Sequence, residues 1–271
     1  RSRPGARWSI LSVARSPLAP ASTSPSARRP MPLSSAVLAS VVGQGEAHLC
    51  DEGEATSLGA RLHREAAAPF VALRNAALDA GFALHPLSGF RSFDRQLSIW
   101  NRKVRGELAV LDSEGRPLDH AMLDGRALVR AILRWSALPG ASRHHWGSDV
   151  DVYDAASTPD GYEVQLLPAE VEAGGMHAPL HEWLDVRIAT GTAFGFYRPY
   201  DRDRGGVAPE RWHLSYAPIA ADYARVLTPT LLQDTIAGAD MLLKDVVLEQ
   251  LDEIYERFVI NVSLPPNQTV A

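Results

Sequence analysis

The strand-like segments of this sequence are few and short, and helical segments separate them in no regular order. They are FALHPLSGF (82–90), SDVDVYD (148–154), FGFYRPY (194–200) and RWHLSYAP (211–218). A doubly wound parallel sheet requires a regular alternation of strand, helix and strand. These four segments lack that alternation, so the sequence predicts an α+β fold in which helices and short strands are mixed.

Helical segments fill much of the remaining sequence. Five regions are predicted to be helical from apolar residues at helical spacing and from start and stop signals: 63–81, 92–106, 124–140, 178–191 and, as two helices with heptad-like leucines, 228–258. Ser92 is expected to cap the second region, and Gly81 to end the first, because glycine readily adopts the backbone conformation that follows a helix. The region 107–120 contains DSEGRP and is predicted to be a turn-rich excursion.

A single cysteine, Cys50, limits how the chain can be stabilised. One cysteine excludes an internal disulfide and also a cysteine cluster that would hold structural zinc. The 271 residues are 46% hydrophobic and 22% charged, which is typical of a globular protein with a substantial core. Stability must therefore come from that core, and any bound metal must use histidine and carboxylate ligands.

Charge is distributed unevenly along the chain. The formal net charge is −5, but residues 1–30 carry six of the 27 basic residues and no acidic one. The rest of the chain therefore has 21 basic and 32 acidic residues, a net charge of −11. Such an acidic chain is not expected to bind nucleic acid. No run of about 18 apolar residues occurs, so no membrane span is predicted.

The first 35 residues differ in composition from the rest. They are rich in arginine, serine and proline and have little to pack, so we expect a disordered tail over 1–35. The chain does not begin with methionine, and this tail is also consistent with upstream sequence translated ahead of Met31. We expect a folded domain over 36–227 and a C-terminal helical extension over 228–271 packed on it.

Metal-capable side chains are concentrated in SRHHWGSDVDVYD, residues 142–154. A catalytic zinc site needs three protein ligands and one open position for water. His144 and Asp151 are seven residues apart, a spacing that lets a loop histidine and a strand carboxylate meet at one ion. Asp149 and Asp151 share one face of the predicted strand, while the valines that alternate with them face the core. Taken alone, the stretch is equally compatible with a polar loop that enters a surface strand.

A second candidate group lies about sixty residues downstream, in PERWHLSY. Glu210 and His213 are separated by three residues, so they can place a general base beside a third metal ligand. Considered singly, each is more simply a surface carboxylate or a partly buried histidine. The zinc interpretation therefore depends on the whole set.

Three motifs in this sequence resemble those of one enzyme family. Ser142-x-His144-x-x-Gly147-x-x-x-Asp151, followed by Glu210-x-Trp212-His213, resembles the zinc D-alanyl-D-alanine carboxypeptidases of the VanY type. SGFRSFDRQ, residues 88–96, is similar to the Gly-aromatic-Arg-Ser segment of that family. The motifs occur in the family's order and span about residues 60–220. Relatives of the family include the vancomycin-resistance D,D-dipeptidases and the peptidase-like domain of hedgehog proteins.

The resemblance implies a fold and a metal site. The fold is the hedgehog/D,D-peptidase-like α+β fold, with a small antiparallel sheet, surrounding helices and a zinc site. Zn²⁺ is then expected to be bound by His144, Asp151 and His213, with water in the fourth position. The peptidase domain of the resemblance falls within the folded region expected over 36–227.

The resemblance also implies roles for the residues around the metal. Glu210 is expected to act as the general base and then the general acid. Arg91 is expected to bind a substrate carboxylate or the developing oxyanion, since its guanidinium is a bidentate donor that stays charged. Ser142 and Gln96 are expected to line the substrate site.

The implied activity is zinc-dependent hydrolysis of peptidoglycan stem peptides or muropeptides, with removal of a terminal D-alanine as the leading expectation. Two alternatives keep the site and change the bond: a D,D-dipeptidase and an L-alanyl-D-glutamate endopeptidase. A third alternative is a non-catalytic zinc-containing binding module. Glu210 argues against it, because such a module needs no general base. The oligomeric state and the length of the substrate stay open.

Four further residues need separate interpretations. Asp149 departs from the family pattern, which usually has a small apolar residue here; it either orients a ligand or competes as one. His145 is expected to point away from His144, behind the site or into the cleft wall. His177 and His181 are four residues apart on a predicted helix, but no glutamate completes an HExxH arrangement, so we expect surface histidines.

The signals for export are weak. Arg28 and Arg29 precede SSAVLASVV in the manner of a short signal peptide, but the apolar stretch is weak and GQGEA is a poor cleavage site. The expected location is therefore the cytoplasm, where recycled muropeptides offer a substrate. The periplasm is the alternative.

Overall fold

The computed structural model of the protein describes residues 34–265. The tail predicted over 1–35 lies almost entirely outside these described residues, and so does the end of the predicted C-terminal extension. Within the described part, no helix has the length and apolar character that a membrane crossing requires.

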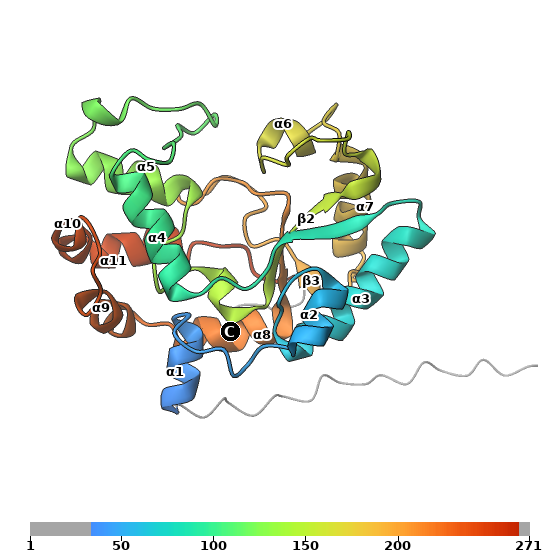
Figure 1. Cartoon of the computed structure of the whole chain (residues 1–271), viewed down its shortest axis with the longest axis horizontal. Coiled ribbons are helices and arrows are strands. Elements are labelled where there is room, and N and C mark those ends of the chain that lie inside the picture. Colours follow the sequence, from blue (N-terminus) through green and yellow to red (C-terminus); the bar gives the residue numbers. More distant parts are fainter. Residues whose placement is uncertain (1–33, 266–271) are drawn as a thin grey trace, which may run out of the picture. The chain divides into compact units, whose positions relative to one another are not determined.

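Four short strands form one antiparallel sheet (Figure 1). They are β1 (Leu84–Ser88), β2 (Asp149–Asp154), β3 (Phe196–Tyr197) and β4 (His213–Tyr216), in the spatial order β1-β2-β4-β3. Each strand lies inside one of the four segments predicted from the sequence. The predicted fold class, α+β with a small antiparallel sheet and surrounding helices, is therefore confirmed.

Pro86 lies at an irregularity in β1. The pairing of β1 with β2 shifts register between Pro86 and Ser88. Because β1 is an edge strand of the sheet, proline can occupy it without removing a hydrogen bond that a central strand would need.

Helices account for most of the other regular structure. They are α1 (Ser35–Val41), α2 (Glu52–Leu58), α3 (Arg64–Asp79), α4 (Phe93–Val104), α5 (Gly125–Trp135), α6 (Pro168–Val171), α7 (Ala178–Ala189), α8 (Ala217–Val226), α9 (Pro229–Ala237), α10 (Lys244–Glu249) and α11 (Leu251–Ile254). Shorter turns add η1 (His120–Met122), η2 (Arg143–Trp146), η3 (Ala155–Ser157) and the π-helical η4 (Tyr255–Val259).

Several helices begin and end close to the positions predicted from the sequence. The Ser92 side chain accepts a hydrogen bond from the backbone N–H of Arg95 at 3.2 Å and caps α4 as expected. Helix α5 ends at Trp135, earlier than the predicted stop at Pro139, because Ser136 already has an extended backbone. The helices α1, α2, α6 and α8 are absent from the sequence prediction.

The C-terminal region differs from the predicted pair of helices. Helix α9 ends at Ala237 with Gly238 as its C-cap, and Leu243 adopts a left-handed conformation with φ 57° immediately before α10. Gln250 then separates α10 from α11, which continues into η4. Leucines at helical spacing do not reveal such breaks, because the leucines on both sides of a break are buried by the same neighbouring helices.

The buried apolar side chains form two clusters. The sheet cluster packs one face of the strands against α3 and α7, and it includes Phe70, Leu73, Val150, Val152, Leu180 and Leu184. The helical cluster joins α4, α5, α8 and the C-terminal helices, and residues on both sides of position 228 contribute to it. Figure 1 shows α4, α5 and the C-terminal helices on the left and α3 and α7 on the right.

The alternation of β2 directs its aspartates to the face of the sheet opposite the sheet cluster. Val150 and Val152 are buried in that cluster, as the sequence predicts. In the register of β2 with β4, Asp151 pairs with His213 and Asp149 pairs with Ser215. The face of the sheet that carries the candidate ligands is thus set by the two-residue period of the strands.

Candidate metal centre

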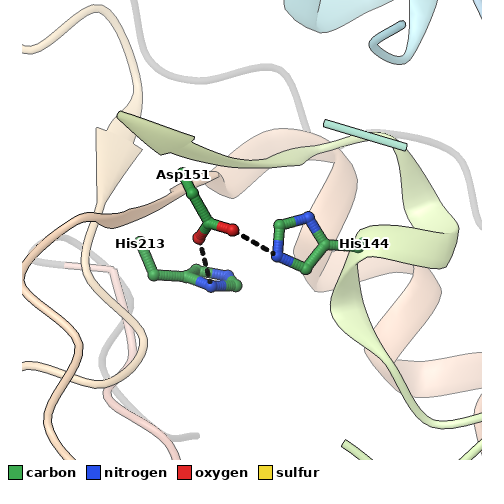
Figure 2. Close-up of side chains that lie close together, drawn as sticks. All are labelled: His144, Asp151 and His213. Carbon is green, nitrogen blue, oxygen red and sulfur yellow. Dashed lines mark ion pairs between the residues drawn. The ribbon is translucent and has the colours of Figure 1, made fainter. Parts of the chain in front are cut away.

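The three predicted metal ligands come together in one buried group. Asp151 on β2 and His213 on β4 are register partners, and His144 reaches the same point from η2. One ligand atom from each lies within 4.8 Å of the others. Figure 2 shows the two carboxylate oxygens of Asp151 directed at different imidazoles, with Oδ2 3.3 Å from Nε2 of His144 and Oδ1 3.3 Å from Nδ1 of His213.

The turn after η2 brings His144 back over β2. Gly147 has φ +64°, and a Cβ added to it would lie 2.7 Å from the backbone nitrogen of His63 and 2.8 Å from Cδ2 of Leu49. Only glycine fits this left-handed, crowded position without a shift of the backbone. Gly147 therefore contributes to the predicted metal site by positioning His144.

Hydrogen bonds determine which imidazole nitrogen of each histidine faces the group. Nδ1 of His144 donates to the carbonyl oxygen of Gly89 at 2.8 Å, so its Nε2 presents a lone pair toward Asp151. Nε2 of His213 donates to Asp149 at 2.8 Å, so its Nδ1 presents a lone pair toward the same carboxylate. Two imidazole nitrogens and one carboxylate oxygen thus converge, which is a donor set suited to zinc.

The carboxylates of Asp149, Asp151 and Glu210 all lie within 3.3 Å of the His213 imidazole. Burial alone would lower the pKa of His213, but the neighbouring carboxylates of Asp149, Asp151 and Glu210 raise it well above its ordinary value. Burial would likewise raise the pKa of Asp151, but His144 and His213 hold it well below its ordinary value. Oδ1 of Asp151 is buried and accepts no hydrogen bond from residues 34–265. A divalent cation is the partner that this arrangement fits.

Asp149 lies behind His213 and does not point into the group. Its carboxylate accepts hydrogen bonds from Nε of Arg143 at 2.8 Å, Oγ of Ser148 at 2.6 Å and Oγ of Ser215 at 2.8 Å, besides the bond from His213. Burial would raise its pKa, but the Arg143 guanidinium and His213 hold it well below the ordinary range. Of the two interpretations left open, the geometry favours the one in which Asp149 orients a ligand.

Glu210 reaches the metal group from the loop before β4. Its Oε2 lies 3.2 Å from Nδ1 of His213, the nitrogen that faces the group. Its backbone is held by a bond from Glu210 N–H to the carbonyl of Tyr200 at 2.9 Å and by one from His213 N–H to the Glu210 carbonyl at 3.1 Å. A carboxylate held beside a metal site is suited to act as a general base and a general acid.

Arg91 also faces this region, and its neighbours fix it in place. Its guanidinium donates to Oε1 of Gln96 at 2.9 Å and to Oγ of Ser88 at 3.2 Å, and its backbone N–H donates to the His144 carbonyl at 3.1 Å. Gln96 is fully buried and also donates to the carbonyl of Ala137 at 2.7 Å. The expected substrate contact of Gln96 is therefore revised, because its side chain holds Arg91 and does not line the cavity.

The metal group opens into a cavity of about 270 Å³. Arg91, Ser142 and Glu210 line it together with the three predicted ligands, and the roles expected for these residues stay predictions. Leu111, from the turn-rich excursion over 107–120, forms part of its wall.

Sequence reasoning missed several residues of this cavity, among them Lys103, Trp135, Leu167 and Tyr200. One signal for Lys103 was available. It lies seven residues after Gln96, which is about two helical turns, so both residues share one face of α4. Trp135, Leu167 and Tyr200 come from three separate segments, and no spacing in the sequence connects them to the ligands.

The expectations for the remaining histidines have mixed outcomes. His145 points away from the metal group, as expected: its Nδ1 donates to the Arg91 carbonyl at 2.6 Å and its Nε2 accepts from Gly140 N–H at 3.2 Å. The surface positions expected for His177 and His181 are wrong, because both are fully buried. They lie where the packed face of α7 meets the rest of the fold, and hydrophobicity patterns do not identify a buried histidine.

Comparison with known proteins supplies the family. Residues 59–219 match the VanY family, described as D-alanyl-D-alanine carboxypeptidase. Two relatives are uncharacterized proteins of Haemophilus influenzae. One is 32% identical over 125 residues, which cover 45% of this chain and 93% of the relative. The other is 42% identical over 98 residues, which cover 36% of this chain and 67% of the relative.

Solved structures show a weaker similarity. VanYB in complex with D-alanine-D-alanine is 24% identical, with 73% of this chain and 92% of that chain covered and a TM-score of 0.43. The vancomycin-resistance D,D-pentapeptidase VanY in complex with Zn(II) is 24% identical, with 74% and 90% covered and a TM-score of 0.42. The LdcB LD-carboxypeptidase is 20% identical, with 74% and 71% covered and a TM-score of 0.41.

These TM-scores are low, so the assignment rests on the sequence match. That match spans more than half of the chain and contains all three motifs. The protein therefore belongs to the VanY family of D-alanyl-D-alanine carboxypeptidases.

Proposed function

We propose that this protein is a zinc-dependent peptidase that removes the terminal D-alanine from peptidoglycan stem peptides. The observation that carries the proposal is the position of Glu210, whose Oε2 lies 3.2 Å from the inward-facing nitrogen of His213. The same cavity holds Arg91, a cation that can bind a substrate oxygen. Membership of the VanY family supports the substrate class.

The residues present fit a zinc ion. His144, Asp151 and His213 supply two imidazole nitrogens and one carboxylate oxygen, which is a three-ligand set of the kind found in catalytic zinc sites. A zinc ion held there would polarise a peptide carbonyl and make a water molecule a stronger nucleophile. The hydrogen bonds from His144 to Gly89 and from His213 to Asp149 keep both imidazoles in the tautomer that ligation requires.

Glu210 and Arg91 then have separate roles in the reaction, proton transfer for Glu210 and stabilisation of negative charge for Arg91. Glu210 takes a proton from the water that attacks the carbonyl carbon and delivers it to the nitrogen of the departing D-alanine. Arg91 donates hydrogen bonds to the carbonyl oxygen as negative charge develops on it. Because Gln96 and Ser88 already orient the guanidinium, little reorganisation accompanies that step.

The direct test is mass spectrometry of a stem pentapeptide ending in D-Ala-D-Ala after incubation with the zinc-loaded protein. Loss of a single alanine residue supports the carboxypeptidase proposal. Release of a dipeptide supports a D,D-dipeptidase, and release of a longer stem fragment supports an endopeptidase. No cleavage by zinc-loaded protein contradicts the proposal and favours a binding module.

The proposed role of Glu210 is tested by Glu210→Gln. We expect hydrolysis to fall by about 10²–10⁴-fold, because the proton carrier is lost, while zinc content is unchanged. Glu182→Gln is the matched control, since it removes an exposed carboxylate on α7. Peptide hydrolysis and metal content are both measured. Full activity of Glu210→Gln would refute the mechanism.

A further inference from the structure

Lys103 is a charged group in the cavity that the proposed mechanism does not use. It lies next to the last residue of α4 and lines the cavity together with Arg91 and Glu210. Within residues 34–265 its ammonium has no hydrogen bond and no ion pair. Its neighbours on α4 differ in this respect, because Arg102 and Arg105 both pair with Glu107.

The charged form of Lys103 is destabilised when no ligand occupies the cavity. Burial lowers the pKa of Lys103 to about 8, and although Glu210 partly opposes that shift, the charge of Arg91 adds to it. Lys103 is half-buried. A partly desolvated charge without an ion pair is unfavourable, and such charges cluster at functional sites. A cation that faces a cavity without a partner is complementary to an anionic group of whatever enters.

The other two arginine side chains of the cavity differ from Lys103 in their contacts. Arg143 is fully buried, and its guanidinium pairs with Asp149 at 2.8 Å. Arg91 is held by Gln96 and Ser88, and its backbone is bonded to His144, so it is fixed beside the metal group. Lys103 therefore differs from both in having three donors and a flexible stem available for a substrate.

The proposed reaction limits which anion Lys103 can bind. In a peptide cut one residue from its end, the only charged group of the leaving residue is its free carboxylate. That carboxylate lies two bonds from the nitrogen that departs, on the opposite side of the reacting bond from the rest of the substrate.

We propose that Lys103 binds the free carboxylate of the leaving residue, while Arg91 contacts the carbonyl oxygen of the cleaved bond. This inference rests on the proposed function and makes Lys103 the residue that selects peptides with a free C-terminus. Lys103 is thus a specificity residue, and neither the proton transfer nor metal binding requires it.

Kinetics with two substrates test the assignment. The substrates are the stem pentapeptide ending in D-Ala-D-Ala and the same peptide with a C-terminal amide. For Lys103→Gln we expect kcat/KM for the free acid to fall about 10- to 100-fold, mainly through KM, because a charge-assisted hydrogen bond is lost. Hydrolysis of the amide should change less than about 3-fold, and Lys103→Arg should restore part of the preference.

Arg105→Gln is the matched control, because it removes the same charge from an exposed side chain at the same end of α4. It should leave both substrates unaffected. Equal losses of Lys103→Gln on the acid and the amide, or no loss on either, would overturn the assignment while leaving the peptidase proposal intact.

Binding without turnover separates this inference from the proposed function. Calorimetry measures D-alanyl-D-alanine and its amide binding to the zinc-loaded Glu210→Gln variant and to the same variant with Lys103→Gln. We expect the free dipeptide to bind more tightly than the amide, and Lys103→Gln to remove the difference. That result with no cleavage by the wild type would support the inference and refute the proposed activity. Failure of the folded, zinc-loaded protein to distinguish acid from amide would refute the inference.

Discussion

At the scale of single residues, the least expected feature is the polar network behind His213. Asp149 takes a position that is usually small and apolar in the family, and it receives hydrogen bonds from His213, Arg143 and two serines. A carboxylate that accepts from the outer nitrogen of a ligating histidine fixes the ring and makes it a stronger ligand. Arg143 compensates the buried charge of Asp149.

Substitution of Asp149 should therefore weaken metal binding. For Asp149→Asn we expect zinc affinity to fall about 10- to 100-fold, because a neutral amide supports the His213 ring less well and leaves Arg143 without its counter-charge. The measurement is competition for zinc with a chromogenic chelator. Asp154→Asn, at the end of the same strand, is the control: it removes a carboxylate that bonds to backbone N–H groups of Ala83 and Ala156 and should leave zinc affinity unchanged. Unchanged affinity of Asp149→Asn would remove the orienting role.

At the scale of elements, the turn from η2 to β2 is the tightest constraint on the site. The backbone of Gly147 is left-handed, and its carbonyl accepts a hydrogen bond from His63 N–H at 2.8 Å. The turn thus joins the ligand segment to the start of α3, and any displacement of it moves His144.

Gly147→Ala should be strongly destabilising. The left-handed backbone costs a residue with a Cβ about 1–2 kcal/mol, and the clash with His63 and Leu49 adds about 1–3 kcal/mol. Gly161→Ala is the control, because Gly161 has φ +76° but nothing within 4 Å of an added Cβ, so only the backbone cost applies. Urea unfolding of both variants measures how much free energy of unfolding each substitution removes. Equal losses in free energy of unfolding would show that the close contact at Gly147 is relieved without cost.

A second prediction at this scale concerns Lys103 on α4 and the free energy of unfolding. The pKa of Lys103 is about 8 in the folded protein, below that of an unfolded lysine, so its charged form destabilises the fold. Lys103→Met should raise the free energy of unfolding by on the order of 1–3 kcal/mol near neutral pH. The gain should shrink as pH rises from about 8 to about 10.5, where the wild-type lysine becomes neutral in both states. Urea unfolding at both ends of that range measures it, and a loss of stability near neutral pH would contradict the account.

At the scale of the whole described chain, the residues of the predicted metal site come from segments that pack in different apolar clusters. Asp151 and His213 belong to strands whose other face is in the sheet cluster, while Trp146, next to the η2 histidines, packs in the helical cluster. A bound ion would therefore link the two clusters, and its removal should affect global stability as well as activity.

Zinc should accordingly raise the unfolding temperature. Free zinc at 100 times its dissociation constant stabilises the folded state by about 2.7 kcal/mol, and a chelator should reverse the effect. Thermal unfolding with zinc and with chelator measures the shift. Glu210→Gln should keep the shift, since Glu210 is not a proposed ligand, whereas His144→Ala should lose it. A shift that survives in His144→Ala would place the ion elsewhere.

Much of the site was predictable because local sequence carries the relevant geometry. The two-residue period of a strand puts Asp149 and Asp151 on one face, and the cap at Ser92 and the stop at Gly81 place α4 and α3. The motif resemblance connected the ligand segment with the downstream Glu210 and His213, which no local pattern could do.

Other features depend on contacts between distant segments. The sequence determined the strand segments, most of the central helices and the residues that can bind a metal, because these follow from periodicity, caps and side-chain chemistry. Only the tertiary structure decided that Asp149 lies behind His213, that Gln96 holds Arg91 and that His177 and His181 are buried. It also decided that Lys103 lines the cavity with no hydrogen bond or ion pair to the described part of the chain. Each of these features depends on which distant segments pack together, and the spacing of residues along the chain does not predict those contacts.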